Sequence, residues 1–108
     1  MTQPPAPVAP PPKATAETAP LVVKLGGDVV EGGALVTVAA DLRAVWQSGA
    51  ALMVVHGGGP QATQLSERLG LTPRLVGGRR ITDEPTLDVM KMVVSGRLNV
   101  DLVAALRG

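Results

Sequence analysis

Three consecutive glycines stand in the stretch "MVVHGGGPQA" at residues 53–62, between an apolar run and the start of an expected helix. Glycine loses more backbone entropy on folding than any other residue, so a triple glycine weakens a regular element. Free N–H groups at a strand end and at the positive end of a helix form a site for a phosphate or a carboxylate. We therefore predict an anion-binding loop at Gly57, Gly58 and Gly59, in preference to a tight turn with close packing.

Three chemistries use a glycine loop of this kind. The oxyanion hole of an esterase requires a G-x-S-x-G serine and a further histidine, but the motif is absent and His56 is the only histidine. A dinucleotide fingerprint, matched loosely by residues 57–62, requires an acidic residue about 20 positions later, where the chain reads "GRRITD"; it remains a weaker alternative. Phosphoryl transfer spreads developing charge over several oxygens and needs many donors, so it fits best.

A second glycine loop follows a lysine in "VVKLGGD" at residues 22–28. A lysine within an apolar strand is costly unless its ammonium reaches water or a charged partner. In a parallel sheet, Lys24 and the Gly26–Gly27 loop would lie at the same end as the triple glycine. One crevice would then hold a cation and two sets of backbone donors, which we favour over a lysine that merely reaches solvent from a sheet edge.

Two arginines stand in "GGRRITDEP" at residues 77–85, just before a capped helix. The planar guanidinium of arginine is suited to bidentate recognition of a carboxylate. Taken alone, however, Arg79 and Arg80 are better interpreted as solvated side chains beside a turn.

The elements that must position these residues follow from the apolar pattern. Residues 21–25 and 51–55 are short apolar runs followed by glycines, which is typical of buried parallel strands. Helices are predicted from residue 35 to a stop at Gly49, from Pro60 to Gly70 with Ala62, Leu65 and Leu69 inward, and from residue 83 onward. A hairpin is predicted over residues 74–82. The order β-α-β-α-(ββ)-α predicts an α/β domain with a mainly parallel sheet.

The predicted last helix carries apolar side chains near one face, and Thr82 or Asp83 can cap it, with Pro85 tolerated in the first turn. These apolar residues are Leu87, Met90, Val94, Leu98, Leu102 and Leu106.

Composition separates a tail from the folded part. Residues 1–20 hold seven of the ten prolines and none of the 13 glycines, which predicts a disordered tail before a domain at residues 21–108. A net charge of +1 without a basic stripe argues against nucleic acid as a partner. No apolar run approaches the ~20 residues of a membrane span. The absence of cysteine fits a reducing compartment, and we expect a cytoplasmic location.

Taken together, "VVKLGG", "VVHGGGPQ" and "GRRITDEPTLDVMKMVVSGRLN" resemble, in order and spacing, the N-terminal part of the acetylglutamate kinases in the amino acid kinase family. The resemblance runs from about residue 21 to residue 108. It implies the N-terminal half of a three-layer, carbamate kinase-like α/β fold. It also implies ATP- and Mg²⁺-dependent phosphorylation of the side-chain carboxylate of N-acetyl-L-glutamate, giving N-acetylglutamyl 5-phosphate in arginine biosynthesis. A homo-oligomer is implied for the full-length enzyme.

The resemblance also implies roles for individual residues. Lys24 matches the lysine that stabilises the transferring phosphoryl group, and Arg80 matches the arginine that holds the α-carboxylate of the substrate. Arg79 stands where the family more often has an apolar residue. The remaining positions are backbone donors, which comprise a phosphate loop at Gly26, Gly27 and Gly57 and a substrate loop at Gly58 and Gly59. No residue is assigned to a metal.

The nucleotide-binding half of the family lies C-terminal to the matched segment, so most of the ATP site and the Mg²⁺ site are expected outside it. We expect this chain to be an incomplete copy that does not turn over ATP alone. Two alternatives stay open. One is a kinase for a related acidic amino acid derivative, such as an aminoadipate, and the other is a non-catalytic module that binds a carboxylate.

Overall fold

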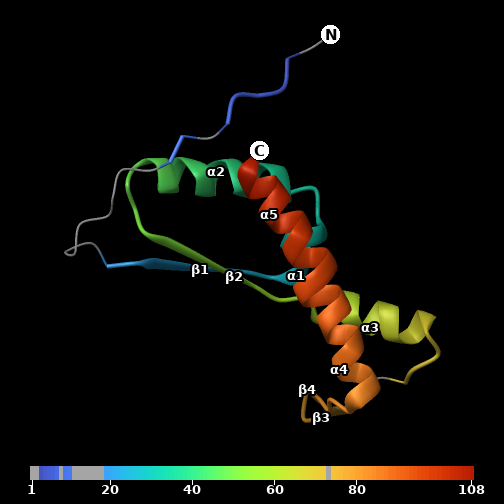
Figure 1. The fold of residues 1–108 in the computed structure, drawn as a ribbon. Coiled ribbons are helices and arrows are strands. Elements are labelled where there is room, and N and C mark those ends of the chain that lie inside the picture. Colours follow the sequence, from blue (N-terminus) through green and yellow to red (C-terminus); the bar gives the residue numbers. More distant parts are fainter. Residues whose placement is uncertain (1–2, 8, 11–18, 73) are drawn as a thin grey trace.

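The computed structural model describes residues 3–7, 9–10, 19–72 and 74–108 (Figure 1). Of the tail predicted over residues 1–20, residues 1–2, 8 and 11–18 lie outside the described part. The tail residues that are described are exposed and belong to no helix or strand. In the described part of the chain, no helix combines the length and the hydrophobicity that crossing a membrane requires.

Two parallel strands form the centre of the fold. Strand β1 (Leu21–Leu25) pairs with β2 (Leu52–His56), with Leu21 opposite Leu52 and Leu25 opposite His56. The parallel arrangement confirms the prediction. Strand β2 begins and ends one residue later than predicted, because His56 continues the ladder opposite Leu25.

Helices connect the strands. Helix α2 (Leu35–Gln47) agrees with the predicted helix, and the left-handed φ of 98° at Gly49 ends that segment. A short helix, α1 (Gly27–Glu31), was not predicted. It begins inside the first glycine loop and has only five residues, too few for an apolar periodicity to be visible.

Helix α3 (Gly59–Arg68) follows the triple glycine and starts one residue before Pro60. Ala62 is fully buried and Leu65 packs against the core, as predicted. The inward prediction for Leu69 is wrong, since this side chain is 55% exposed. It lies beyond the last helical residue, next to a turn at Gly70 with a φ of 76°. The helix instead buries two polar residues, Gln61 and Ser66.

The predicted hairpin is confirmed. Strand β3 (Leu75–Val76) pairs antiparallel with β4 (Arg79–Arg80). The connecting Gly77 and Gly78 have φ values of 57° and 77°. Positive φ at both central residues is the requirement of a type I′ turn, whose twist suits a two-residue hairpin and which glycine meets without strain.

The C-terminal helix is continuous but changes its winding. It consists of α4 (Glu84–Met90), a π-helical segment η1 (Lys91–Leu98), and α5 (Asn99–Arg107) (Figure 1). Its most buried apolar residues are Val89, Val93, Leu98 and Leu102, at intervals of four, five and four. A π-helix has i→i+5 hydrogen bonds, so the interval of five falls where the winding is wider.

The predicted apolar face of this helix is therefore right in its second half and wrong at its start. Leu98 and Leu102 are buried as expected, but Leu87 is 44% exposed. The prediction assumed α-helical spacing throughout, and the wider turn of η1 rotates the buried face between α4 and α5.

The core lies on one side of the β1–β2 pair. Helices α2 and α5 cover this side (Figure 1), where Val23, Leu25 and Val54 pack among the helical side chains. The alternating residues Val22, Met53 and Val55 are exposed on the opposite side. Side chains alternate between the faces of a strand, so Lys24 belongs to this uncovered face.

Asp83 caps the C-terminal helix, as the sequence predicted. Its Oδ1 accepts a hydrogen bond of 2.9 Å from the Thr86 backbone N–H, and Pro85 occupies the first turn. Hydrogen bonding from the side chain and the backbone N–H of Thr86 holds the pKa of this carboxyl below its usual value of 3.8. The cap therefore stabilises the folded state above the ordinary pKa, and the contribution disappears as the pH falls through the lowered one.

We expect Asp83→Ala to lower the melting temperature at pH 7, because the first turn loses its side-chain acceptor. Thermal unfolding followed by circular dichroism from pH 7 to pH 2 checks this. The difference from the parent chain should shrink as the pH falls below about 4. Asp83→Asn is the control, since asparagine caps helices without titrating. A difference that persists unchanged at the lowest pH would contradict a role for the ionised carboxylate.

Candidate active site

The two glycine loops meet at the carboxyl ends of β1 and β2. The Gly57 N–H donates to the Leu25 carbonyl oxygen at 2.9 Å, which continues the strand pairing into the loop. A Cβ atom placed on Gly27 would lie only 2.9 Å from the Gly58 Cα atom. The loops are therefore in direct backbone contact, as the parallel arrangement led us to expect.

The glycines of the two loops differ in how much space surrounds the position that a Cβ atom would occupy. A Cβ atom on Gly58 would lie 2.6 Å from Leu98 Cδ1 and 2.9 Å from Val94 Cγ2, so Gly58 lets the loop pack on η1. Gly59, by contrast, has no neighbouring atom within 4 Å of such a position. Close packing accounts for Gly27 and Gly58, whereas the space beside Gly59 is open to a ligand.

We expect Gly27→Ala to destabilise the chain by about 1–3 kcal/mol, the usual cost of overpacking. The added methyl would meet Gly58 backbone atoms, which cannot rotate away as a side chain can. The free energy of unfolding in urea measures this effect. Gly33→Ala is the matched control, because no atom lies within 4 Å of its Cβ position. Equal stability of the two variants would contradict the loop contact.

Arg80 links the hairpin to the start of α3. Its Nη2 donates to the Gly59 carbonyl oxygen at 3.1 Å and to Thr63 Oγ1 at 2.6 Å. Its Nη1 is buried and has no hydrogen-bond partner in the described part of the chain. One edge of the guanidinium is thus fixed by the protein, and a buried N–H group is left beside the triple glycine.

Arg79 occupies a different environment. It precedes Arg80 in the two-residue strand β4, so the two side chains leave opposite faces. Arg79 is exposed and Arg80 is half-buried. The contacts with α3 that fix Arg80 come from its position in β4 and from the folding of the hairpin against that helix.

Lys24 lies two residues before Gly26, which caps α1. Its side chain is exposed on the sheet face that the helices leave uncovered. Its neighbour Leu25 is buried on the other face and pairs with His56, directly before the triple glycine. The structure therefore places the Lys24 backbone near the glycine loops, while its role in catalysis stays a prediction.

Sequence reasoning missed several polar residues around the loops. His56 Nδ1 lies 2.9 Å from the Gly57 carbonyl oxygen, to which it can only donate, and His56 Nε2 lies 3.3 Å from Asn99 Oδ1. Thr63 holds Arg80, and Gln61 donates to the Gly27 carbonyl oxygen at 2.8 Å. Gln61 was visible within "HGGGPQ", but nothing in the sequence indicated that it faces the other loop.

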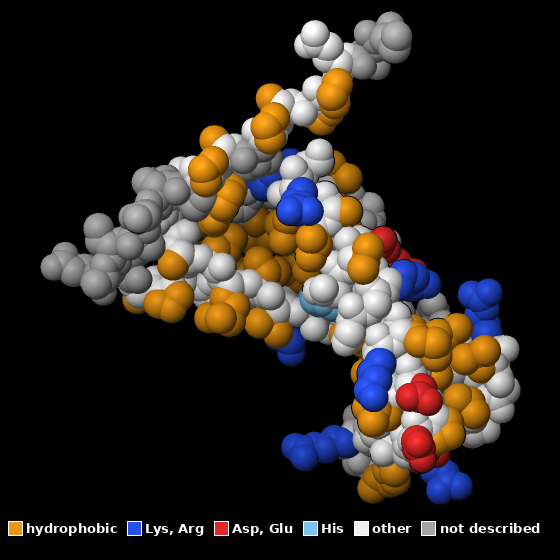
Figure 2. Space-filling view, viewed as in Figure 1, with side chains coloured by type: hydrophobic (Ala, Val, Ile, Leu, Met, Phe, Trp, Pro, Cys, Tyr) orange, Lys and Arg blue, Asp and Glu red, His pale blue; other side chains and the backbone are white. Residues whose placement is uncertain are grey.

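An apolar groove lies away from these residues. Figure 2 shows hydrophobic side chains gathered in a hollow between α2, α5 and the sheet. The hollow has a volume of about 250 Å³, and none of its lining residues belongs to the predicted site. Its lining comprises Leu42, Arg43, Trp46, Leu52, Val54, Val103, Leu106 and Arg107.

The model of the amino acid kinase family matches residues 19–108, which is most of the chain. The chain belongs to the amino acid kinase family. The match includes both glycine loops, the hairpin with Arg80 and the whole C-terminal helix, so the resemblance inferred from the three motifs is confirmed at the level of the family.

Curated relatives support a narrower grouping. An acetylglutamate kinase of Sorangium cellulosum (strain So ce56) is 62% identical over 92 residues, which cover 85% of this chain and 32% of that protein. An acetylglutamate kinase of Methanocella arvoryzae is 37% identical over 89 residues, covering 82% of this chain and 30% of that protein. The chain spans about a third of the length of these relatives.

A solved structure shares the fold. It is an N-acetylglutamate synthase from Neisseria gonorrhoeae in complex with coenzyme A and N-acetyl-glutamate. Its TM-score is 0.70 at 33% identity, and the match covers 81% of this chain and 20% of that one. The α/β architecture with a parallel strand pair is therefore that of the amino acid kinase family.

Proposed function

We propose that this chain forms the acylglutamate-binding part of an acetylglutamate kinase. The reaction is the ATP-dependent phosphorylation of the side-chain carboxylate of N-acetyl-L-glutamate to N-acetylglutamyl 5-phosphate, a step of arginine biosynthesis. We further propose that it operates in the cytoplasm, within a homo-oligomer.

One observation carries the proposal, namely the half-engaged guanidinium of Arg80. Its Nη2 is held by Gly59 and Thr63, and its buried Nη1 has no partner in the described part of the chain. A buried, unpaired N–H of a charged group is costly, and an incoming carboxylate would satisfy it with a charge-assisted hydrogen bond. Arg80 stands beside Gly59, where the space above the backbone is open. These features suit an acidic small molecule.

The relatives narrow the ligand. The curated proteins that match the chain carry the name acetylglutamate kinase, at identities up to 62%. The structural neighbour was solved with N-acetyl-glutamate, although its own activity is that of a synthase. The names of these relatives therefore suggest N-acetyl-L-glutamate as the ligand.

In the proposed reaction, a side-chain carboxylate oxygen of N-acetyl-L-glutamate forms a bond to the γ-phosphorus while the bond to ADP breaks. The charge on the transferring group spreads over its equatorial oxygens. The Lys24 ammonium and the backbone N–H groups of Gly26 and Gly27 are the groups of this chain suited to stabilise it. Gly57, also predicted for this loop, does not fit that role, because its N–H already donates to the Leu25 carbonyl oxygen. Arg80 and the Gly58–Gly59 backbone would hold the acceptor in place, which contributes through positioning.

The proposed use of Mg²⁺ finds no support in these residues. In the described part of the chain, no three acidic or histidine side chains come together. The ion would accompany the phosphates of ATP, whose site we expect mostly outside this segment.

A chimera tests the function. The chain spans about a third of the length of its relatives, so the test uses a chimera. In this chimera the chain replaces the matching 92-residue segment of the Sorangium cellulosum enzyme. We expect the chimera to form an acyl phosphate from ATP and N-acetyl-L-glutamate. Hydroxylamine traps this product as a hydroxamate, which is then measured. N-acetyl-L-2-aminoadipate, one methylene longer, should react with a kcat/KM about 10–200-fold lower. A folded chimera that binds N-acetyl-L-glutamate without forming hydroxamate would instead support the carboxylate-binding module.

A further inference from the structure

We propose that Gln61 is a positioning residue that fixes the phosphate-facing loop at Gly27 against the substrate-facing loop at Gly58 and Gly59. This inference rests on the proposed function, because it assigns a purpose to the distance between the two loops. Neither glycine motif explains why a glutamine stands at this position.

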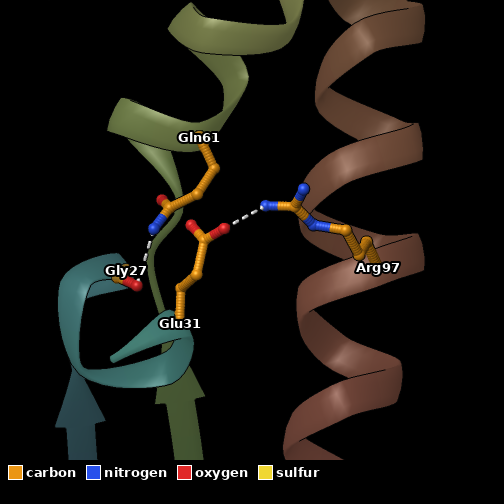
Figure 3. Close-up of polar contacts among 4 residues, drawn as sticks. All are labelled: Gly27, Glu31, Gln61 and Arg97. Carbon is orange, nitrogen blue, oxygen red and sulfur yellow. Dashed lines mark hydrogen bonds and ion pairs between the residues drawn. The ribbon is translucent and has the colours of Figure 1, made fainter. Parts of the chain in front are cut away.

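The Gln61 amide has one possible orientation. Its Nε2 donates to the Gly27 carbonyl oxygen at 2.8 Å, and the residue is only 5% exposed (Figure 3). A carbonyl oxygen can only accept, so the nitrogen must face Gly27. Gln61 belongs to the first turn of α3, which begins at Gly59. One helical turn therefore carries both the open substrate-facing glycine and the link to the other loop.

The fit at this point is tight. A Cβ atom on Gly27 would lie 2.5 Å from Gln61 Oε1 and 2.9 Å from the Gly58 Cα atom. The amide fills the space next to Gly27, so that the loops cannot move closer together. The hydrogen bond also prevents them from separating. Gln61 thus determines the spacing of the two sets of backbone N–H groups.

The two ends of the Gln61 amide have opposite effects on stability, since Nε2 makes a stabilising hydrogen bond to Gly27 whereas Oε1 is unpaired in the part of the chain that the structure describes. Gln61 Oε1 is buried without a hydrogen-bond partner in the described residues, and an unpaired buried acceptor is destabilising. Methionine has the same length and would avoid that penalty. Buried polar groups left unsatisfied in a native structure call for an explanation, and a functional role is one of the common ones.

A second contact holds the other end of α1. Arg97 Nη2 of η1 lies 2.8 Å from Glu31 Oε1 (Figure 3), but these side chains are 51% and 45% exposed. Exposed ion pairs contribute little to stability. The short helix is thus held by a buried hydrogen bond at its start, by Val30 in the core, and by a weak surface pair at its end. Gln61 supplies the side-chain hydrogen bond between α3 and the first glycine loop.

The test compares Gln61→Met and Gln61→Glu with Gln64→Met and Gln64→Glu, since Gln64 is exposed on the same helix. In the 108-residue chain, NMR follows the Gly26, Gly27 and Gly58 amides, and titration measures the affinity for N-acetyl-L-glutamate. We expect Gln61→Met to stay folded, to shift these amide signals and to lose at least tenfold in affinity. The Gln64 variants should match the parent chain.

The Gln61→Glu variant separates positioning from general stability. Its carboxylate would repel the Gly27 carbonyl oxygen at neutral pH, whereas the protonated carboxyl could donate to it as the amide does. Affinity relative to Gln64→Glu should therefore recover as the pH falls towards 4. Because an ionised carboxylate is costly wherever it is buried, the amide signals of Gly26, Gly27 and Gly58 should return to their parental positions together with the affinity if the hydrogen bond to Gly27 is responsible. If Gln61→Met fails to fold, the pH profile of the Gln61→Glu variant tests the inference instead.

Two results would overturn the inference. One is a folded Gln61→Met variant with parental affinity and unshifted glycine signals, and the other is a Gln61→Glu variant without pH dependence. A parent chain that does not bind N-acetyl-L-glutamate would count against the proposed function instead. In that case the glycine signals and the solvent exchange of the Gln61 side-chain amide still show whether Gln61 fixes the loops.

Discussion

Arg80→Ala should weaken the binding of N-acetyl-L-glutamate by roughly 2–5 kcal/mol, the usual cost of truncating one partner of a desolvated charge pair. Arg79→Ala should change the affinity by only about 0–1 kcal/mol, as for an exposed charge. The difference arises because Arg80 is half-buried with one nitrogen unpaired in the described structure, whereas Arg79 is exposed. Isothermal titration of each variant with N-acetyl-L-glutamate measures both values.

Two further variants separate ligand recognition from the structural role of Arg80. Thr63→Val removes a partner of Nη2 but leaves Nη1 free, so we expect it to reduce affinity less than Arg80→Ala. Arg80→Lys keeps the charge but loses the planar fork, and it should not restore full affinity. Equal losses for Arg79→Ala and Arg80→Ala would rule out the assignment of the α-carboxylate to Arg80.

Lys24→Ala should lower kcat at least ~10²-fold, the scale of losing one preorganised group that stabilises developing charge. The reason is the position of Lys24, two residues before the loop that starts α1 and on a sheet face open to solvent. The measurement is hydroxamate formation by the chimera with saturating substrates. KM for N-acetyl-L-glutamate should change little, because the ammonium is assigned to the transferring group and not to the acceptor.

Lys91→Ala is the matched control, since Lys91 is exposed on η1 and belongs to neither loop. It should keep the kcat of the parent chimera. A Lys24→Ala variant that retained kcat and altered only KM would contradict a role in the transition state. Such a result would favour the alternative interpretation, in which Lys24 is a solvated side chain on an uncovered sheet face.

Much of the fold could be predicted from local patterns. The strand at residues 21–25, the hairpin turn at Gly77–Gly78 and the Asp83 cap all agree with the structure. Each depends on neighbouring residues alone, through apolar runs, positive φ at glycine or a side chain that accepts from N–H groups three residues ahead. The parallel pairing also followed, because a helix of 13 residues between two strands crosses back over the sheet.

The wrong predictions for the helices have one cause in common. The local spacing of apolar residues shows neither a change in helical winding nor a contact with a distant segment. Uniform α-helical spacing predicts Leu87 on the buried face, but η1 shifts that face by one residue and Leu87 is exposed. Leu69 was counted as helical, although the chain turns before it packs. A five-residue helix such as α1 is too short to show a period at all.

For the site, the sequence by itself determined the residue types that could do the chemistry, namely Lys24, the two glycine loops and an arginine pair. It did so because glycine runs and a lysine in an apolar strand are costly, and such costs indicate function. The residue types alone did not distinguish Arg79 from Arg80, and the resemblance favoured Arg80. The tertiary structure adds the contacts that hold Arg80, with Thr63 and Gly59, 17 and 21 residues away. It also brought Gln61 to Gly27 across 34 residues. Contacts of this kind depend on how the hairpin and α3 pack, which no local pattern encodes.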